Sequence, residues 1–215
     1  MITEPTTLAT DYVLGALCAA FAWRLHAVAR ATNQRSVGLW ALAFAATAFG
    51  SFAGGTYHGF STVLPAAVAA AIWTLTTIVV GFAACLLLSA ALVAAVRPGA
   101  RRWLVFGVWA QFAVYAIWML WHDAFVNVIV EYGAAMLMTL VLQIATPGLR
   151  RAPSTRWIVA GVGVTILAAA VQQSGFDLHR NLNHNDLQHL VQMVAVSLLY
   201  KGGTKLRDAA AANYV

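Results

Sequence analysis

The chain has 215 residues, of which 61% are hydrophobic and only 9% are charged. Soluble domains are about 25% charged, so this composition excludes a water-soluble surface. The mean hydropathy of +0.76 indicates an integral membrane protein. Because a span takes about 20 apolar residues, seven spans use most of the chain and exclude a large extramembrane domain.

Seven apolar runs, separated by turn residues or charges, predict an all-α bundle of seven transmembrane helices in a single domain, residues 1–215. The third run is long enough to tilt or to project beyond the bilayer. No basic segment of a cleaved signal precedes the first run, so we expect that run to be retained. The predicted spans are 8–29, 38–60, 65–96, 102–121, 124–146, 156–174 and 184–202.

The basic residues predict the orientation of the bundle. Twelve of the thirteen Lys and Arg follow spans one, three, five and seven, and only Arg180 lies in a loop on the other side. Cytoplasmic loops carry the excess of basic residues, so we expect the N-terminus outside and the C-terminus in the cytoplasm. The net charge of +6 is thereby explained without nucleic acid, and the chain suits a bacterial inner membrane.

The two cysteines lie in apolar runs, which excludes a disulfide framework and a thiolate metal site. The histidines are more informative, because five of the six fall at the predicted outer ends of the spans. Ionisable groups at membrane depth are costly and mark functional sites. The outer histidines are His58, His122, His179, His184 and His189.

The seventh span begins with a polar stripe. At about 100° per residue, Asn185, Asp186, His189 and Gln192 share one face of a helix, which we expect to line the bundle interior. Helix capping by Asn183 or Asn185 is the structural alternative, and it explains one Asn only.

The fifth span repeats this pattern with Asp123, Asn127 and Glu131 at intervals of four residues. The deepest of them, Glu131, must be protonated, paired or bound to a metal in a medium of low dielectric. A structural carboxyl group that links helices by hydrogen bonds is an equally good interpretation.

The second span carries Ser51, Gly55 and His58 on one face, and Gly50 and Gly54 form a spacing that permits close helix packing. Polar residues of spans three and four line a cavity or form hydrogen bonds between helices. They are Trp73, Thr74, Thr76, Thr77, Gln111 and Tyr115.

A histidine that ends span two and a histidine-rich start of span seven resemble the CREST superfamily of membrane hydrolases, which includes alkaline ceramidases and the progestin and adiponectin receptors. In that superfamily three histidines hold a zinc ion beside a Ser and an Asp. By this resemblance, His58 corresponds to the ligand of span two and His189 to the second histidine of the HxxxH pair of span seven.

The chain departs from the motifs of that superfamily at three places. Asn185 replaces the first histidine of the pair, with His184 one residue away. Gly54 stands at the position of the serine, which leaves Ser51 or Thr56 as substitutes. The third span contains no acidic residue at all.

The resemblance implies a zinc-dependent hydrolase that acts on a lipid amide or ester. Zinc with three protein ligands lowers the pKa of a bound water and polarises a carbonyl group. We expect His58 and His189 to be ligands, with His184 or His122 as the third. Asp186, Asp123, Glu131 or Ser51 supply the catalytic groups, and Asn185, Gln192 and Asn127 orient the imidazoles.

A non-enzymatic membrane protein is the alternative: a transporter, a proton pathway or a receptor. In it, Asp123, Glu131, Asp186 and His189 form a relay or a polar pocket. Haem is a weaker interpretation, because axial histidines need comparable depths across the bundle and these crowd one face. In every case the expected partners are membrane lipids or a lipid-like substrate.

Overall fold

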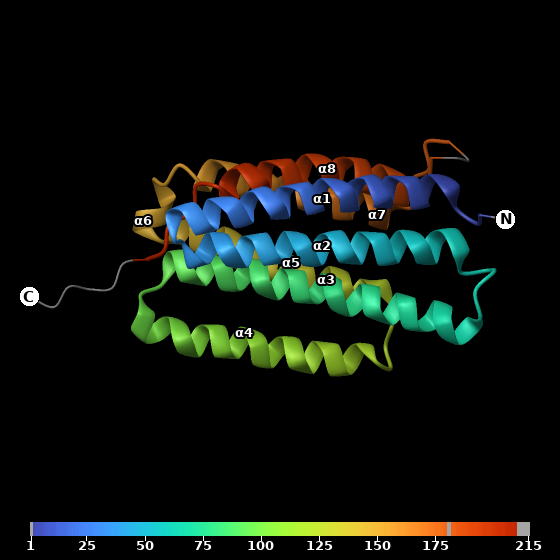
Figure 1. The fold of residues 1–215 in the computed structure, drawn as a ribbon, viewed down its shortest axis with the longest axis horizontal. Helices are drawn as coiled ribbons and strands as arrows, with labels where there is room; N and C mark the ends of the chain where they lie inside the picture. The colour runs from blue at the N-terminus through green and yellow to red at the C-terminus, as the bar shows by residue number, and fades with distance from the viewer. Residues whose placement is uncertain (1, 180–181, 210–215) are drawn as a thin grey trace, which may run out of the picture.

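The computed structural model describes residues 2–179 and 182–209, so Arg180 lies outside the described residues. The chain is 83% helical and the described residues contain no strand, which confirms the all-α prediction. The helices are α1 Pro5–Thr32, α2 Arg35–Phe60, α3 Ala66–Ala95, α4 Pro98–Met119, α5 Phe125–Ala145, α6 Pro147–Arg150, α7 Thr155–Ser174 and α8 His184–Gly203 (Figure 1).

Seven of these helices correspond to the seven predicted runs, and α6 is a single turn that the sequence analysis did not predict. The weak break predicted between the fourth and fifth runs is present, because residues 120–124 separate α4 from α5. Proline occupies the first turn of α1, α4 and α6, where its missing N–H group costs no helical hydrogen bond.

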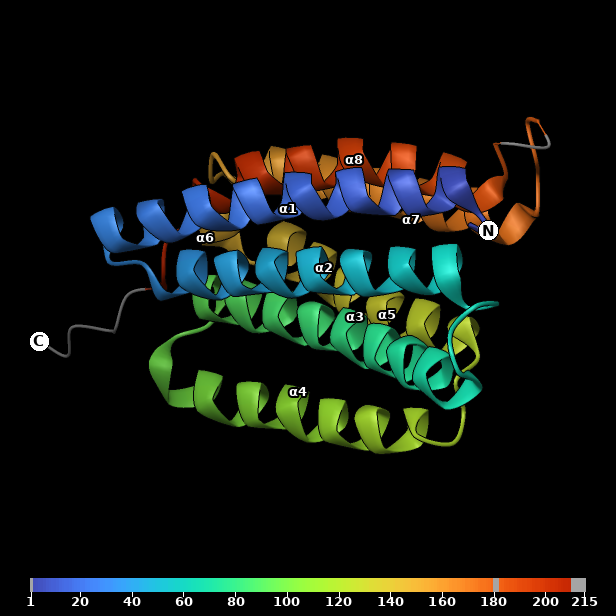
Figure 2. The same cartoon turned by 45° about the vertical axis from the view of Figure 1, so that its right-hand side comes forward.

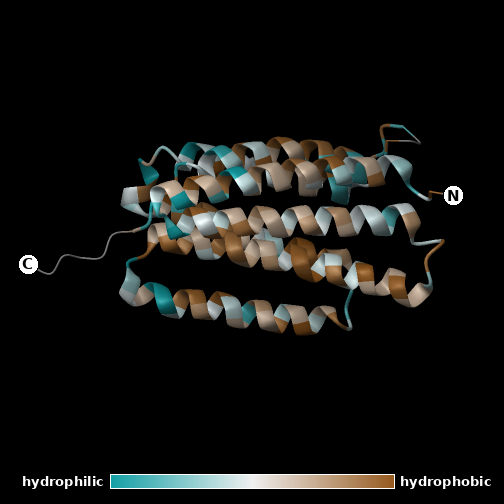
Figure 3. Ribbon diagram, viewed as in Figure 1, coloured by the Kyte–Doolittle hydropathy of each residue, from teal (hydrophilic) through white to brown (hydrophobic). Residues whose placement is uncertain are grey.

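Five helices, α1, α2, α3, α5 and α7, are long and apolar enough to cross a membrane. The helices α4 and α8 are long enough as well, but they do not reach the same hydropathy. Arg101 and Arg102 lie in the first turns of α4, and α8 begins with its polar stripe. Figure 3 shows apolar residues along the bodies of the helices, with hydrophilic ones gathered toward the ends.

Six helices form a closed ring. In the order α1, α2, α3, α5, α7 and α8, each packs against the next, and α8 returns to α1. The helix α4 stands outside this ring, packs against α3, and lies at the edge of the bundle opposite α8 in both views (Figures 1 and 2). The centre of the ring is therefore shared by helices that are far apart in the sequence.

Large side chains fill the ring in the half that holds the C-terminal end of α8. Trp40, Leu25, Ile158 and Leu199 are all at most 2% exposed. The Trp40 indole donates a hydrogen bond to the Leu199 carbonyl oxygen at 3.1 Å, and Gly203 lies directly against its ring. This half is a solid core, which leaves the opposite half as the place for a cavity.

Glycines on α2 bring α1 and α3 close to it. A Cβ atom on Gly55 would lie 2.9 Å from the Cβ of Asp11 on α1, and one on Gly54 would lie 3.3 Å from the Thr76 side chain on α3. The predicted role of small residues in close helix packing is thus confirmed for this face. Because α1 approaches so closely, Asp11 reaches the interior of the ring.

The segment that follows α8 folds back against the start of α2. The Asp208 carboxylate accepts hydrogen bonds from the backbone N–H groups of Arg35 and Ser36, both at 2.9 Å, and from the Ser36 hydroxyl. These are free N–H groups at a helix N-terminus, where a negative charge is also favoured by the helix dipole. A residue 172 positions away therefore caps α2.

We expect Asp208→Ala to lower the free energy of unfolding by about 1 kcal/mol, the usual cost of losing an N-cap. For a chain of this size that corresponds to a decrease in Tm of about 2–4 °C. Thermal unfolding in detergent micelles measures it, with the exposed neighbour Lys205→Ala as the control. An unchanged Tm for Asp208→Ala would show that this carboxylate does not hold the C-terminal segment.

Candidate functional site

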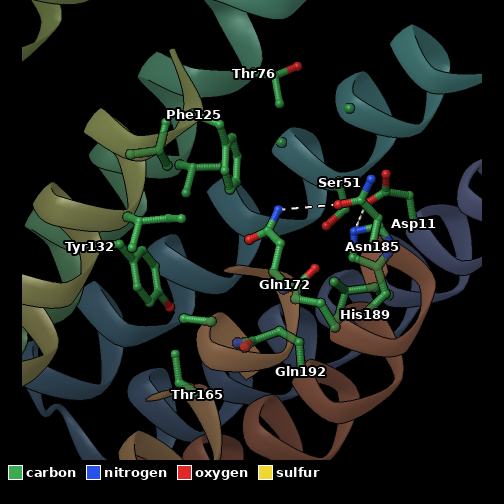
Figure 4. Close-up of a pocket in the computed structure, with 18 of the residues that line it drawn as sticks. Asp11, Ser51, Thr76, Phe125, Tyr132, Thr165, Gln172, Asn185, His189 and Gln192 are labelled. Carbon is green, nitrogen blue, oxygen red and sulfur yellow. Dashed lines mark hydrogen bonds and ion pairs between the residues drawn. The ribbon is translucent and has the colours of Figure 1, made fainter. Parts of the chain in front are cut away.

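A cavity of about 630 Å³ occupies the half of the ring opposite the solid core, and all six ring helices line it. One wall is largely apolar, with Trp73, Val80, Phe125, Ile129 and Met136 from α3 and α5, and it also carries the hydroxyl groups of Thr76 and Tyr132. The other wall is polar and comes from α1, α2, α7 and α8 (Figure 4). Its polar residues are Asp11, Thr47, Ser51, His58, Thr165, Gln172, Gln173, His184, Asn185, Gln188, His189 and Gln192.

Asp11 and His189 form the centre of the polar wall. His189 Nε2 lies 3.2 Å from Asp11 Oδ1, and the two side chains are only 12% and 7% exposed. On the other side of the imidazole, His189 Nδ1 lies 3.0 Å from the Thr10 hydroxyl oxygen. Both nitrogens of His189 are therefore occupied by groups from α1.

The hydrogen bonds place a proton between these two residues. Thr10 Oγ1 lies 3.1 Å from the Thr7 carbonyl oxygen and 3.0 Å from His189 Nδ1, and its single proton serves one of these acceptors. If it serves Nδ1, then Nε2–H donates to Asp11; if it serves Thr7, Nδ1 carries a proton and the contact between Nε2 and Asp11 holds a further one. The Asp11–His189 pair thus shares a proton and holds the Asp11 carboxyl group in a fixed orientation at the cavity wall.

A second histidine, His58 at the end of α2, has its own carboxylate. Its Nδ1 lies 3.2 Å from Glu4 Oε2 on the segment that leads into α1. The imidazole also meets the Trp73 indole edge to face, with ring centres 6.2 Å apart. His58 therefore lines the cavity but is held by groups from two neighbouring segments.

The start of α8 is organised by a capping box. The Asn183 side chain accepts hydrogen bonds from the Asn185 and Asp186 N–H groups, and Asp186 Oδ2 accepts one from the Asn183 N–H at 2.8 Å. The capping box thus accounts for Asn183 and for one carboxyl oxygen of Asp186. The other oxygen, Oδ1, is buried and has no hydrogen-bond partner among the described residues.

His184 lies at the rim of the cavity and is held by the loop that precedes α8. Asp177 Oδ1 accepts hydrogen bonds from the His184 backbone N–H and from its Nδ1, both at 2.9 Å. These bonds, from the side chain first and the backbone second, hold the pKa of the Asp177 carboxyl below its ordinary value. The third cavity histidine therefore also faces a carboxylate.

Two amide side chains join α7 to α8 across the cavity wall. Gln172 donates to Asn185 Oδ1 at 3.4 Å, and Gln192 and Thr165 follow deeper on the same two helices (Figure 4). The predicted stripe of α8 is confirmed: Asn185, His189 and Gln192 line the cavity, while Asp186 is buried beside it.

Several predicted site residues lie elsewhere. Glu131 and Asn127 line a smaller pocket of about 290 Å³ between α4 and α5, where Gln111 donates a hydrogen bond to the Glu131 carboxylate. Asp123 is exposed and contributes its backbone oxygen to the Trp73 indole. The His122 ring is stacked on Trp118 at 3.6 Å and does not line the central cavity.

The structure therefore brings together His58, His189, His184 and Ser51, and it separates them from Glu131, Asn127, Asp123 and His122. Sequence reasoning missed Asp11, Thr10 and Glu4, which all come from the start of the chain. Asp11 carried a usable signal, because it is an ionisable residue inside an apolar helix.

The predicted zinc site needs three ligand atoms at suitable distances from one another. Ligand bonds of 2.0–2.2 Å place two ligands of a tetrahedral zinc about 3.3 Å apart, which His189 Nε2 and Asp11 Oδ1 satisfy. A third ligand is missing: within residues 2–179 and 182–209, no three His, Cys, Asp or Glu side chains are grouped to hold an ion. The side chains as arranged do not fit a three-ligand zinc site.

Comparison with known families identifies one match. A family model described as a family of unknown function (DUF6962) matches residues 6–208, so the chain belongs to that family. No curated protein and no solved structure matches the chain significantly.

Proposed function

We propose that this member of the family is a receptor or carrier that binds an amphiphilic, lipid-like molecule in its central cavity. The observation that supports this most is the division of the cavity into an apolar wall from α3 and α5 and a hydrogen-bonding wall from α1, α7 and α8. Binding sites for small molecules are typically apolar cavities of 300–1,000 Å³ with a few converging polar groups.

The cavity is also accessible from the side of the bundle. Gly133 on α5 and Ile166 on α7 both line it and are both exposed, Ile166 by 53%. In a membrane these positions face lipid, so an acyl chain has a direct route to the apolar wall. The polar wall then receives the head of the molecule.

We also propose that the chain crosses a bacterial inner membrane seven times, with the N-terminus outside and the C-terminus in the cytoplasm; the distribution of charge supports this orientation. The ring is closed only if α8 lies beside α1 and α7, and α8 then crosses with its polar stripe turned toward the cavity rather than toward lipid. Its low hydropathy is compatible with spanning, because the polar face is covered by protein.

Cysteine labelling in intact cells tests this orientation. We expect a membrane-impermeant maleimide to label Val63→Cys, in the loop between α2 and α3, and not Ala100→Cys, near the start of α4. Both positions are exposed, and the native Cys18 and Cys85 are buried. Labelling of Ala100→Cys alone would reverse the predicted orientation. Equal labelling of both positions would contradict the prediction that α3, which lies between them, crosses the membrane.

Filling the cavity tests the binding function directly. Gly133 lines the cavity, and a Cβ atom there meets nothing within 4 Å, so Gly133→Leu adds a bulky side chain at the cavity wall without a backbone clash. We expect retention of a co-purifying amphiphile to fall by about tenfold, which corresponds to about 1.4 kcal/mol of binding free energy. Native mass spectrometry of the purified protein measures the retained mass.

Gly107→Leu is the matched control, because Gly107 is also a helical glycine with open space around it, but it lies on α4 and outside the cavity. It is expected to retain the amphiphile as the unmutated protein does. Equal retention by Gly133→Leu, or no retained or added amphiphile in the unmutated protein, would refute the proposal.

Hydrolysis of a lipid amide or ester is the second candidate. It is favoured by the presence of the Asp11 carboxyl, the Ser51 hydroxyl and the His58 imidazole on one cavity that suits a lipid chain. His189 orients Asp11 rather than facing the substrate, because both of its nitrogens are occupied by α1. Asp11 is then the group that takes a proton from an attacking hydroxyl or water.

Elemental analysis and a hydrolysis assay with long-chain amides and esters test this candidate together. Hydrolysis is expected to fall by about 10²-fold or more in Asp11→Asn if that carboxylate is the general base, with Asp208→Asn as the control at the opposite end of the bundle. Bound zinc in the unmutated protein that is lost in His58→Ala would restore the metal-dependent mechanism. Absence of both hydrolysis and bound metal would remove this candidate and leave the binding function.

A further inference from the structure

The histidines in the polar wall of the cavity are each balanced by a carboxyl group. Three histidines contribute to it, and each faces a carboxylate: His58 faces Glu4, His184 faces Asp177, and His189 faces Asp11. A paired imidazole and carboxylate carry no net positive charge. The histidines therefore do not provide a site for an anion.

A fourth carboxyl group has no such partner. Asp186 is 1% exposed, its Oδ1 has no hydrogen-bond partner among the described residues, and it is close enough to Asp11 for the two groups to interact electrostatically. Its other oxygen, Oδ2, accepts the Asn183 N–H. Together with Glu4, Asp177 and Asp11, Asp186 makes four carboxyl groups beside three imidazoles, so carboxyl groups outnumber imidazoles at this end of the cavity.

No Lys or Arg lines the cavity within the described part of the chain. The described basic residues gather at the other end of the bundle, in the C-terminal parts of α1 and α8, in the segments after α3, α5 and α8, or in the first turns of α2, α4 and α7. A phosphate, sulfate or carboxylate head would therefore find amide and hydroxyl donors but no cation to balance its charge, and it would lie beside the Asp11 carboxyl group. The cost of burying an unpaired anion opposes such a ligand.

The same wall is rich in acceptors for a donor group. Asp11, Asn185 and Ser51 offer oxygen atoms at the cavity, and Gln188 and Gln173 add amide oxygens at its rim. An ammonium group has three N–H donors and a positive charge, so it satisfies several acceptors at once and balances the carboxyl groups.

On the basis of the proposed binding function, we propose that the cavity selects amphiphiles with an ammonium head and rejects anionic ones, and that Asp11 is the residue that determines this selection. The alkyl chain lies against Phe125, Ile129 and Met136, and the ammonium lies between Asp11 and Asn185. The Asp11–His189 pair holds the Asp11 carboxylate in position for this contact.

A matched series of ligands tests the proposal. Dodecylamine, dodecanol and dodecane-1-sulfonate have the same alkyl chain and differ in the head group, which is cationic, neutral and anionic in turn. Equilibrium dialysis against the full chain in nanodiscs of zwitterionic lipid measures binding, and nanodiscs with Gly133→Leu correct for partition into lipid. We expect dodecylamine to bind at least about tenfold more tightly than the sulfonate, with dodecanol between them.

Asp11→Asn removes the carboxyl group that lines the cavity, with little change in shape, and is expected to abolish most of the preference for the amine. Asp208→Asn makes the same chemical change at the opposite end of the bundle and is expected to keep it. Circular dichroism and Tm of both variants verify that they are folded, and dodecanol binding gives a readout that does not depend on charge.

The outcomes separate the two proposals. The selection for ammonium is wrong if the sulfonate binds as tightly as the amine, or if Asp11→Asn keeps the full preference for the amine. In either case the alkyl ligands still bind, and the proposed binding function stands. If none of the three binds above the Gly133→Leu background, the cavity does not bind alkyl amphiphiles, and both proposals fail.

Discussion

The close approach of α1 to α2 is the contact on which the polar site depends. Gly55 has no side chain at the point where Asp11 and Tyr12 cross it, and a Cβ there would lie 2.8 Å from the Tyr12 ring. Apolar surfaces gain little by association in lipid, so such close packing and interhelical hydrogen bonds hold membrane helices together. Moving α1 outward by the width of one methyl group would withdraw Asp11 and Thr10 from His189, and the polar wall would lose its centre.

The ring also explains how the polar residues of α8 are accommodated in the interior of the bundle. Its filled half, around Trp40 and Leu199, fixes the spacing of the helices, and smaller or polar side chains leave the other half hollow. In that half two polar pairs join different helices, Asp11 with His189 and Gln172 with Asn185, while Asp186 Oδ1 has no partner among the described residues. Stability and a binding cavity are therefore provided by different layers of one bundle rather than by competing residues.

Much of this arrangement follows from periodicity, and the rest depends on contacts across the ring. The helices and the stripe of α8 were predictable, because a 3.6-residue period places Asn185, His189 and Gln192 on one face. The partner of His189 was not, because it lies 178 positions earlier in the sequence and only the ring order brings α1 beside α8. The same limit explains Glu131 and His122: Glu131 faces a pocket between α4 and α5, and His122, in the loop between these helices, is stacked on Trp118.

The hydrogen bonds of His189 decide between the two kinds of chemistry that the sequence allows. A metal ligand must present an unprotonated nitrogen to the ion, and its other nitrogen is usually held by a hydrogen bond. Here Thr10 supplies that hydrogen bond at Nδ1, but Nε2 faces a single carboxylate, and His58 is turned toward Glu4 instead of completing the set. Each imidazole is thus the partner of a carboxyl group rather than a member of a shared triad. An arrangement of this kind holds carboxylates at the cavity wall, where a group with positive charge and N–H donors is the complementary ligand.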